Sequence, residues 1–406
     1  MSRFFVVVGL LWGTTFASAA DWPQWLGPKR DGSSTEVVPA WQGELKADWS
    51  IDVAEGNSSP VVADGKLFIH AIGKDIDEEM MSAYDAATGK LLWQQKYAKT
   101  KFKPLFGVGP RATPVVDGEL VFSLGNTGTL VCYSAATGKI VWQAETLATP
   151  SKDNLLFGVS ASPIVVGDLV VVQTGQKGSV GTVAYNKKTG KKAWTAGKDA
   201  SSYAAPIWIN NQIVMLSGAH LQGINTKGEI VWKVPFRDLL NESSTTPVYA
   251  GGLYIASSVT AGAVGVQVTG SGDKMEAKQV WKNNKLTCYF STPVAVDDKH
   301  MYMATGVASL TKPSIMLRCV EIATGKEIWN KPDIGKYHAA LLKMGDGKLL
   351  MHDDQGNLML LAPNVTKYEE LARTKACGPT WAHPAVANGK IYVRDESTLK
   401  CISIPK

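Results

Sequence analysis

Residues 84–93 read Tyr-Asp-Ala-Ala-Thr-Gly-Lys-Leu-Leu-Trp, and this ten-residue pattern recurs along the chain. It returns as Tyr-Ser-Ala-Ala-Thr-Gly-Lys-Ile-Val-Trp at residues 133–142 and as Tyr-Asn-Lys-Lys-Thr-Gly-Lys-Lys-Ala-Trp at residues 185–194. Further copies, some of them looser, end at Trp232, Trp281 and Trp329. A pattern that repeats at similar intervals along a chain indicates a fold assembled from similar structural units.

A second element precedes the copies of this pattern and reads as a short strand, a tight turn and another strand. Its first example is Ser-Pro-Val-Val-Ala-Asp-Gly-Lys-Leu-Phe at residues 59–68, where Asp-Gly is typical of a hairpin turn. Eight such starts are about 41 to 54 residues apart, an interval typical of propeller blades. The starts are Ser59-Pro60, Thr113-Pro114, Ser162-Pro163, Ala205-Pro206, Thr246-Pro247, Thr292-Pro293, Ala339-Ala340 (without the Pro) and His383-Pro384.

The repeat predicts an all-β fold, an eight-bladed β-propeller of four-stranded blades. The repeated Trp is expected on the outermost strand, where it packs between neighbouring blades. The last unit begins at Pro384 and leaves room for about three strands before Lys406. Residues 47–52, Ala-Asp-Trp-Ser-Ile-Asp, have the outer-strand pattern, so we expect this N-terminal strand to close the ring. A seven-bladed WD-type ring is the alternative, but its Gly-His and Trp-Asp signatures are absent from the sequence.

The N-terminus reads as an export signal. Arg3 precedes an apolar run at Phe4–Leu11, and Ala17-Ser18-Ala19 has the form of a cleavage site. We therefore expect residues 1–20 to be a signal peptide and the protein to be periplasmic or secreted, although an uncleaved anchor is the alternative. The aromatic segment of residues 21–46 is expected to pack on the ring, and residues 47–406 to form the propeller.

Composition limits the classes of partner. The formal net charge of +6 falls to about +5 without Arg3, and the charges are spread along the chain, which argues against nucleic-acid binding. After signal cleavage we expect no transmembrane span, and we expect a monomer. The five Cys residues are interpreted as small buried side chains, with a Cys288–Cys377 disulfide left as an alternative.

The Thr-Gly-x-x-x-Trp ending resembles the tryptophan-docking motif of the pyrroloquinoline-quinone (PQQ) dehydrogenases. The same repeat occurs in the lipoprotein of the outer-membrane β-barrel assembly machinery. The resemblance covers residues 47–406 and implies the fold, while the family contains both enzymes and binding scaffolds. In the enzymes it implies PQQ at the ring centre, a calcium ion and a disulfide between adjacent cysteines. This sequence lacks adjacent cysteines, so we expect neither a required cofactor nor a metal site, and PQQ with calcium is the alternative.

The loops between one blade and the next are the longest and most varied, and loops of this kind carry function. One residue per blade, three positions before each strand-one Pro, is expected near the channel mouth: Asn57, Arg111, Ser160, Tyr203, Ser244, Phe290, Tyr337 and Trp381. We select Arg111, Trp381, Tyr337, Tyr203 and Asn57 as candidate binding residues. They would form a pocket for a flat or anionic ligand, with Arg111 meeting a carboxylate. The alternative is that these side chains only fill the channel.

Three functions follow from these observations. The leading hypothesis is an exported, non-catalytic propeller that binds a protein or a small molecule on the long-loop face. The alternatives are a PQQ-dependent dehydrogenase and an outer-membrane protein assembly factor. The sequence leaves the choice between enzyme and scaffold open and favours the scaffold.

Overall fold

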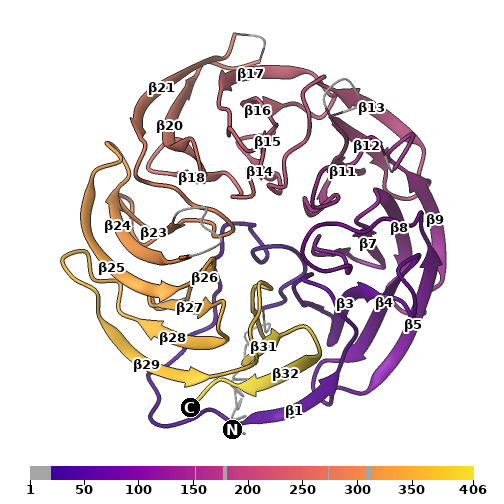
Figure 1. Ribbon diagram of the computed structural model, residues 1–406, viewed down its shortest axis with the longest axis horizontal. Helices are drawn as coiled ribbons and strands as arrows, with labels where there is room; N and C mark the ends of the chain where they lie inside the picture. The colour runs from indigo at the N-terminus through magenta and orange to yellow at the C-terminus, as the bar shows by residue number, and fades with distance from the viewer. Residues whose placement is uncertain (1–19, 151, 177–180, 273, 307–311) are drawn as a thin grey trace, which may run out of the picture.

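The structure is a computed structural model, and the residues that it describes form 32 strands in eight four-stranded sheets arranged as a ring (Figure 1). This confirms the predicted eight-bladed propeller. The predicted signal peptide lies outside the described residues except for Ala20. Among the residues that are described, none lies in a helix long and apolar enough to cross a membrane. The described residues are 20–150, 152–176, 181–272, 274–306 and 312–406.

The inner half of each blade consists of its first two strands. The first strands surround the central axis and are β2 (Val61–Ala63), β6 (Val115–Asp117), β10 (Ile164–Val166), β14 (Ile207–Ile209), β18 (Val248–Ala250), β22 (Val294–Ala295), β26 (Ala339–Lys343) and β30 (Ala385–Ala387). The second strands are β3 (Lys66–Ile72), β7 (Leu120–Leu124), β11 (Leu169–Gln173), β15 (Gln212–Leu216), β19 (Leu253–Ser258), β23 (His300–Gly306), β27 (Leu349–Asp353) and β31 (Lys390–Arg394).

The outer half consists of the third and fourth strands. The third strands are β4 (Glu78–Asp85), β8 (Thr129–Ser134), β12 (Thr182–Asn186), β16 (His220–Ile224), β20 (Gly262–Thr269), β24 (Ile315–Glu321), β28 (Asn357–Leu361) and β32 (Thr398–Ser403). The fourth strands are β5 (Leu91–Ala98), β9 (Ile140–Glu145), β13 (Lys192–Ala196), β17 (Ile230–Pro235), β21 (Glu276–Asn283), β25 (Glu327–Gly335), β29 (Glu370–Lys375) and β1 (Ala47–Asp52). Because β1 pairs antiparallel with β32, a strand from the start of the chain completes the eighth blade, as predicted.

The hydrophobic core lies between neighbouring blades. In one cluster, Phe68 and Met81 of the first blade pack with Val121, Val131 and Tyr133 of the second, and each of these side chains is almost fully buried. Alternation of side chains along each strand directs residues to both faces of a blade, so each blade contributes to two such interfaces. Packing between blades therefore holds the ring together and fixes where the loops between blades converge.

The repeated Trp docks on the next blade. Trp93 Nε1 donates a hydrogen bond to the Ala135 carbonyl at 3.0 Å, and Gly138 of the same turn lies against the indole ring with φ +73°. Equivalent bonds join Trp49 to Ala86, Trp142 to Lys187, Trp194 to Thr226, Trp281 to Ile322 and Trp329 to Asn364. Trp93 is only partly buried, so this contact orders the blade edge while the core lies further in.

The segment before β1 crosses the ring. Its hydrogen bonds reach the first five blades. Trp22 bonds to Val62 of blade one and Pro23 to Val116 of blade two. Arg30 bonds to Pro163 of blade three and Pro206 of blade four, and Trp25 bonds to Thr246 of blade five. At blades seven and eight, Ser34 and Gly32 pair with Lys343, and Glu36 accepts from the Gly389 amide. Gly32 also lies against Val294 of blade six. The segment therefore fills part of the channel and joins all eight blades.

All five cysteines lie in the described part of the chain, and each is free and buried. The Cys288–Cys377 disulfide therefore does not form, and that alternative is wrong. Burial raises the pKa of both thiols to about 12. The five residues pack as small apolar side chains, as the sequence interpretation held.

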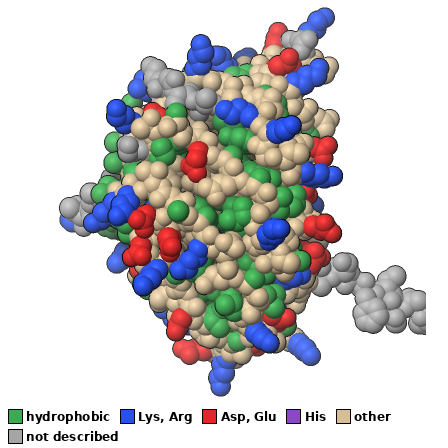
Figure 2. Space-filling view, turned by 90° about the vertical axis from the view of Figure 1, so that its right-hand side faces the viewer, with side chains coloured by type: hydrophobic (Ala, Val, Ile, Leu, Met, Phe, Trp, Pro, Cys, Tyr) green, Lys and Arg blue, Asp and Glu red, His purple; other side chains and the backbone are tan. Residues whose placement is uncertain are grey.

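The outer wall of the ring is a mixed surface. On the side shown in Figure 2, Lys and Arg side chains alternate with Asp and Glu, and hydrophobic side chains are visible between them. Leu91, Leu92 and Val141 on β5 and β9 are each nearly half exposed. Single exposed apolar residues of this kind are ordinary in soluble folds.

Candidate functional site

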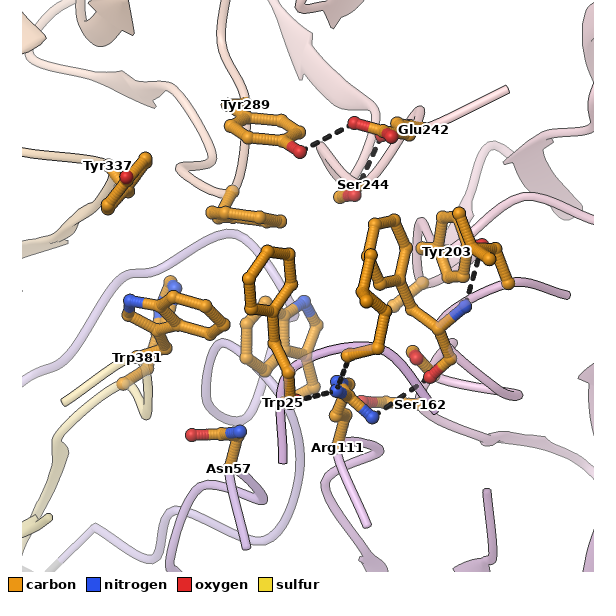
Figure 3. A pocket seen from close by; sticks show the side chains of 18 of the residues that line it. Trp25, Asn57, Arg111, Ser162, Tyr203, Glu242, Ser244, Tyr289, Tyr337 and Trp381 are labelled. Carbon is orange, nitrogen blue, oxygen red and sulfur yellow. Dashed lines mark hydrogen bonds between the residues drawn. The ribbon is translucent and has the colours of Figure 1, made fainter. Parts of the chain in front are cut away.

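The links between blades converge on one pocket of about 580 Å³ at the channel mouth. All eight positions predicted to surround the mouth line this pocket, including the five candidates Asn57, Arg111, Tyr203, Tyr337 and Trp381 (Figure 3). The other lining residues are Trp25, Leu105, Phe106, Leu156, Phe157, Ser160, Ser162, Ala205, Leu240, Glu242, Ser244, Tyr289, Phe290 and His383. The volume falls in the range of ligand pockets in proteins.

Aromatic rings form the first wall of the pocket. Phe290 stacks on Trp381 with ring centroids 5.3 Å apart and on Tyr289 with centroids 3.9 Å apart. Tyr337 meets Trp381 edge-on at 6.3 Å. These stacked and edge-on arrangements are the ones that aromatic quadrupoles favour.

A second aromatic group forms the facing wall. Two Leu-Phe-Gly-Val runs, residues 105–108 and 156–159, supply Phe106 and Phe157. The two phenyl rings stack with centroids 6.1 Å apart, and Phe157 also contacts Tyr203. Phe106 meets Trp381 edge-on at 6.4 Å, which joins the two walls. The pocket is therefore a largely apolar, aromatic-lined cleft suited to a flat or apolar group.

Arg111 holds the second wall together. Its Nη1 donates to the Phe157 carbonyl at 2.9 Å, and its Nη2 donates to the carbonyls of Leu105 and Phe106 (Figure 3). Burial lowers the pKa of Arg111 to about 10, with Tyr203 and Glu55 acting in the opposite direction. Through these bonds Arg111 positions the two Leu-Phe-Gly-Val loops, and its contact with a ligand carboxylate, expected from the sequence, stays a prediction.

Glu242 is the carboxylate among the residues that line the pocket. Tyr289 donates its hydroxyl to Glu242 Oε2 at 2.5 Å, and Ser244 Oγ donates to the Glu242 carbonyl (Figure 3). Burial and the neighbouring carboxylate raise the pKa of Tyr289, so this phenol stays protonated. Desolvation also raises the pKa of Tyr203, to about 12. The hydroxyl groups of the pocket therefore act as hydrogen-bonding groups at neutral pH.

The floor of the pocket comes from the N-terminal segment. The Trp25 ring lies 4.3 Å from the ring of His383, and its Nε1 donates to Thr246 Oγ1. Arg30, which is 3% exposed, anchors this segment by donating to the carbonyls of Pro206 and Pro163. Its pKa is lowered to about 9 by burial. The segment that joins the blades therefore also shapes the site.

Three buried histidines lie close together, and one of them, His383, lines the pocket. The rings of His338 and His383 are 4.9 Å apart, and His352 Nε2 lies 3.5 Å from Cys377 Sγ. Burial lowers the pKa of His338 to about 4 and that of His352 to about 3, and it holds the pKa of His383 well below its usual value. These rings are therefore neutral at ordinary pH.

Several lining residues lie outside the positions that the repeat predicts. Trp25 precedes the repeats, so the one-per-blade count could not place it, although its aromatic surroundings had suggested packing on the ring. Tyr289 directly precedes the ring position Phe290, and Leu240 and Glu242 lie in a link of no repeated pattern. The two Leu-Phe-Gly-Val runs were the available signal for Phe106 and Phe157.

The pocket residues do not fit PQQ with calcium. PQQ carries several carboxylates, whereas the one guanidinium among the lining residues gives its donors to backbone carbonyls. The lining carboxylate, Glu242, is bonded to Tyr289. In the described part of the chain, no group of three or more His, Cys, Asp or Glu residues is placed to hold a metal ion.

Comparisons with known proteins agree with this architecture. The structure of BamB from Moraxella catarrhalis has a TM-score of 0.61 at 16% identity, over 89% of this chain and 98% of that one. A europium-containing methanol dehydrogenase has a TM-score of 0.69 at 10% identity, over 95% and 98% of the two chains. A quinohemoprotein alcohol dehydrogenase from Comamonas testosteroni has a TM-score of 0.69 at 13% identity, over 95% of this chain and 80% of that one.

These identities show the shared fold alone, and no curated protein sequence matches the chain. A family model does match. It is the PQQ_2 model, described as "Outer membrane protein assembly factor BamB", and it matches residues 77–331, which is more than half of the chain. The chain therefore belongs to the PQQ_2 family of β-propeller proteins.

Proposed function

We propose that this protein is an exported, non-catalytic binding protein whose ligand occupies the aromatic pocket at the channel mouth. The observation that supports this most directly is that the charged residues of the pocket bond to other groups of the protein. Arg111 bonds to backbone carbonyls and Glu242 bonds to Tyr289, so these groups shape a wall. The remaining lining is dominated by aromatic and aliphatic side chains, which favour burial of an apolar ligand.

A PQQ-dependent dehydrogenase remains the enzyme alternative, and the pocket gives it little support for the reasons above. A role in outer-membrane protein assembly is a second candidate, since the matching family model carries that description. Export to the periplasm or beyond is common to all three hypotheses. We expect the protein to act as a monomer.

Titration with the apolar dye N-phenyl-1-naphthylamine tests the proposal. The native chain should bind the dye, and a Trp381→Ala/Phe290→Ala variant should bind it about tenfold more weakly, because the stacking contacts of the first wall are lost. The control is Leu91→Ala on the exposed start of β5, which should leave dye binding unchanged. Equal dye binding by all three proteins would show that the pocket does not take ligands.

Addition of PQQ and calcium tests the enzyme alternative. We expect no change in the quinone absorbance spectrum upon mixing with the protein. A calcium-dependent spectral change that the Trp381→Ala/Phe290→Ala variant abolishes would instead assign the pocket to PQQ and reject the non-catalytic proposal.

A further inference from the structure

The apolar surface of the pocket continues outward onto its rim. Large apolar side chains on three separate links project there: Leu105 is 49% exposed, Phe106 50%, Leu156 62%, Leu239 79% and Leu240 51%. Four of these five line the pocket, and Leu239 directly precedes Leu240. A ligand held inside the pocket would leave much of this rim in water, so the rim requires a larger partner.

The rim segments are also joined to one another. The Leu105 amide donates to the Leu156 carbonyl at 3.5 Å, and Arg111 bonds to carbonyls in both runs. Leu239 and Leu240 lie in the turn that follows β17, where the Leu239 amide donates to Thr260 Oγ1 and the Leu240 amide donates to Asp238 Oδ1. The exposed leucines are therefore held on fixed backbone positions, which lowers the entropy lost when a partner covers them.

Phe106 is held in a strained conformation. Its φ is +60°, in the left-handed region that bulky side chains rarely adopt. Its side chain is half exposed, so burial in this chain does not explain why the conformation is kept. Strain of this kind is found at binding sites, where the surrounding structure enforces it. The Arg111 bond to the Phe106 carbonyl is part of that enforcement.

From the rim and the strained Phe106 we infer that the partner is an apolar segment of another polypeptide chain, which places an aromatic or leucine side chain in the pocket and flanking apolar residues on the rim. This inference rests on the proposed binding function of the pocket. Recognition through an anchor side chain with surrounding apolar contacts is common in protein interfaces. A free small molecule is the competing occupant, and it would use the pocket without the rim.

A displayed library of random short peptides, selected on the native protein, provides the probe. The selected peptides should be rich in aromatic and leucine residues. They should bind a Leu239→Ser variant, which is altered at the one rim residue that does not line the pocket, about tenfold more weakly than the native protein, because burial of that leucine is lost. The same variant should bind N-phenyl-1-naphthylamine as the native protein does, because that dye fits within the pocket.

A Phe106→Gly variant supplies a second measurement. Glycine accepts a positive φ, so relief of the strain should offset the loss of the Phe106 contacts with Phe157 and Trp381, and this variant should melt close to the native protein while it binds the selected peptides more weakly. Phe157→Ala is the matched control, because Phe157 lacks that strain and packs on Tyr203, so its loss should lower the melting temperature. A lower melting temperature for Phe106→Gly with unchanged peptide binding would make Phe106 structural and contradict the inference.

The outcomes separate the two proposals. If the library yields no binder, or if its binders do not distinguish the native protein from the rim variant, the peptide inference is wrong. Dye binding that depends on Trp381 and Phe290 would then leave the proposed pocket function in place. Loss of both peptide binding and pocket-dependent dye binding in the native protein would overturn both proposals.

Discussion

Two arginines show how single residues shape the site. Arg111 and Arg30 are both largely buried, and both donate to backbone carbonyls of loops that are distant in sequence. A guanidinium offers several donors in one plane, so it can join several carbonyls at once. Arg111 thereby fixes the second wall of the pocket, and Arg30 fixes the segment that carries Trp25 on the floor.

Replacement of Arg111 should loosen the two Leu-Phe-Gly-Val loops. We expect Arg111→Ala to lower the free energy of unfolding by about 1–3 kcal/mol, because its bonds to carbonyls are lost. Arg111→Lys should retain only part of the free energy of unfolding that Arg111→Ala loses, since an ammonium group cannot reproduce the planar set of donors. Chemical denaturation of the three proteins measures the effect. A lysine variant as stable as the native protein would contradict the positioning role.

The buried histidines next to the pocket predict a pH dependence of stability. The pKa values of His338 and His352 are lowered by burial to about 4 and about 3, whereas an unfolded His titrates near 6.5. His338 is also close to Asp354, and His352 to His338 and Lys375. Between the folded and unfolded pKa values, the unfolded chain binds more protons than the folded protein. The stability that these neutral rings contribute is therefore fully present above the unfolded pKa and falls as the pH drops from there toward 4.

Denaturation at a series of pH values tests this dependence. His352→Gln should reduce the slope of unfolding free energy between pH 6 and pH 4 by up to about 1.4 kcal/mol per pH unit, because one proton fewer is taken up on unfolding. His338→Gln should act in the same direction. Slopes unchanged in both variants would show that these rings do not control the acid response.

At the level of strands and turns, the docking Trp depends on the turn that receives it. Blade seven lacks the Trp on β29, and the blade it faces has no turn between its third and fourth strands, because these are β32 and β1 from opposite ends of the chain. Trp232 also differs, since it donates to Gln212 of its own blade. In the next blade the Thr-Gly dipeptide, Thr269-Gly270, stands at the end of β20 and not inside the link to β21. A Thr-Gly dipeptide is not required of the acceptor turn, since Trp194 and Trp329 dock on the Thr226 and Asn364 carbonyls of turns that lack it.

A pair of glycine substitutions tests the docking contact. Gly138 and Gly65 have nearly the same φ, +73° and +71°. A Cβ at Gly138 would strike the Trp93 ring, whereas a Cβ at Gly65 would meet none of the described atoms within 4 Å. Gly65→Ala should cost about 1–2 kcal/mol from the backbone alone. Gly138→Ala should cost about 1–3 kcal/mol more from the clash, as measured by chemical denaturation. Equal losses would show that the docking contact contributes little.

For the whole molecule, the N-terminal region both closes the ring and fills its centre. β1 completes the last blade, and the segment before it joins the first strands of the blades and supplies Trp25. An open propeller would present an unpaired strand edge at β32. Stability and the shape of the pocket therefore depend on the same stretch of chain.

Two truncations separate these contributions. A chain that starts at Ala47 keeps β1 but loses Trp22, which is 2% exposed and whose burial alone is worth about 3–5 kcal/mol. It should melt well below a chain that starts at Asp21 and should bind dye more weakly, since the Trp25 floor is lost. A chain that starts at Val53 should be the least stable because the last blade is open. If the chain starting at Ala47 melts within a degree or two of the longer one, the segment is not structural.

The sequence by itself determined the number of blades, the closing strand and the eight positions at the channel mouth. These follow from a repeat, because each copy repeats the same local pattern of turns, apolar alternation and docking Trp. Only the tertiary structure decided what Arg111 and Trp25 do there. A hydrogen-bonding partner such as the Phe157 carbonyl lies 46 residues from Arg111, and the contact of Trp25 with Thr246 spans 221 residues. Such contacts depend on how the links fold over the finished ring, and the links do not repeat.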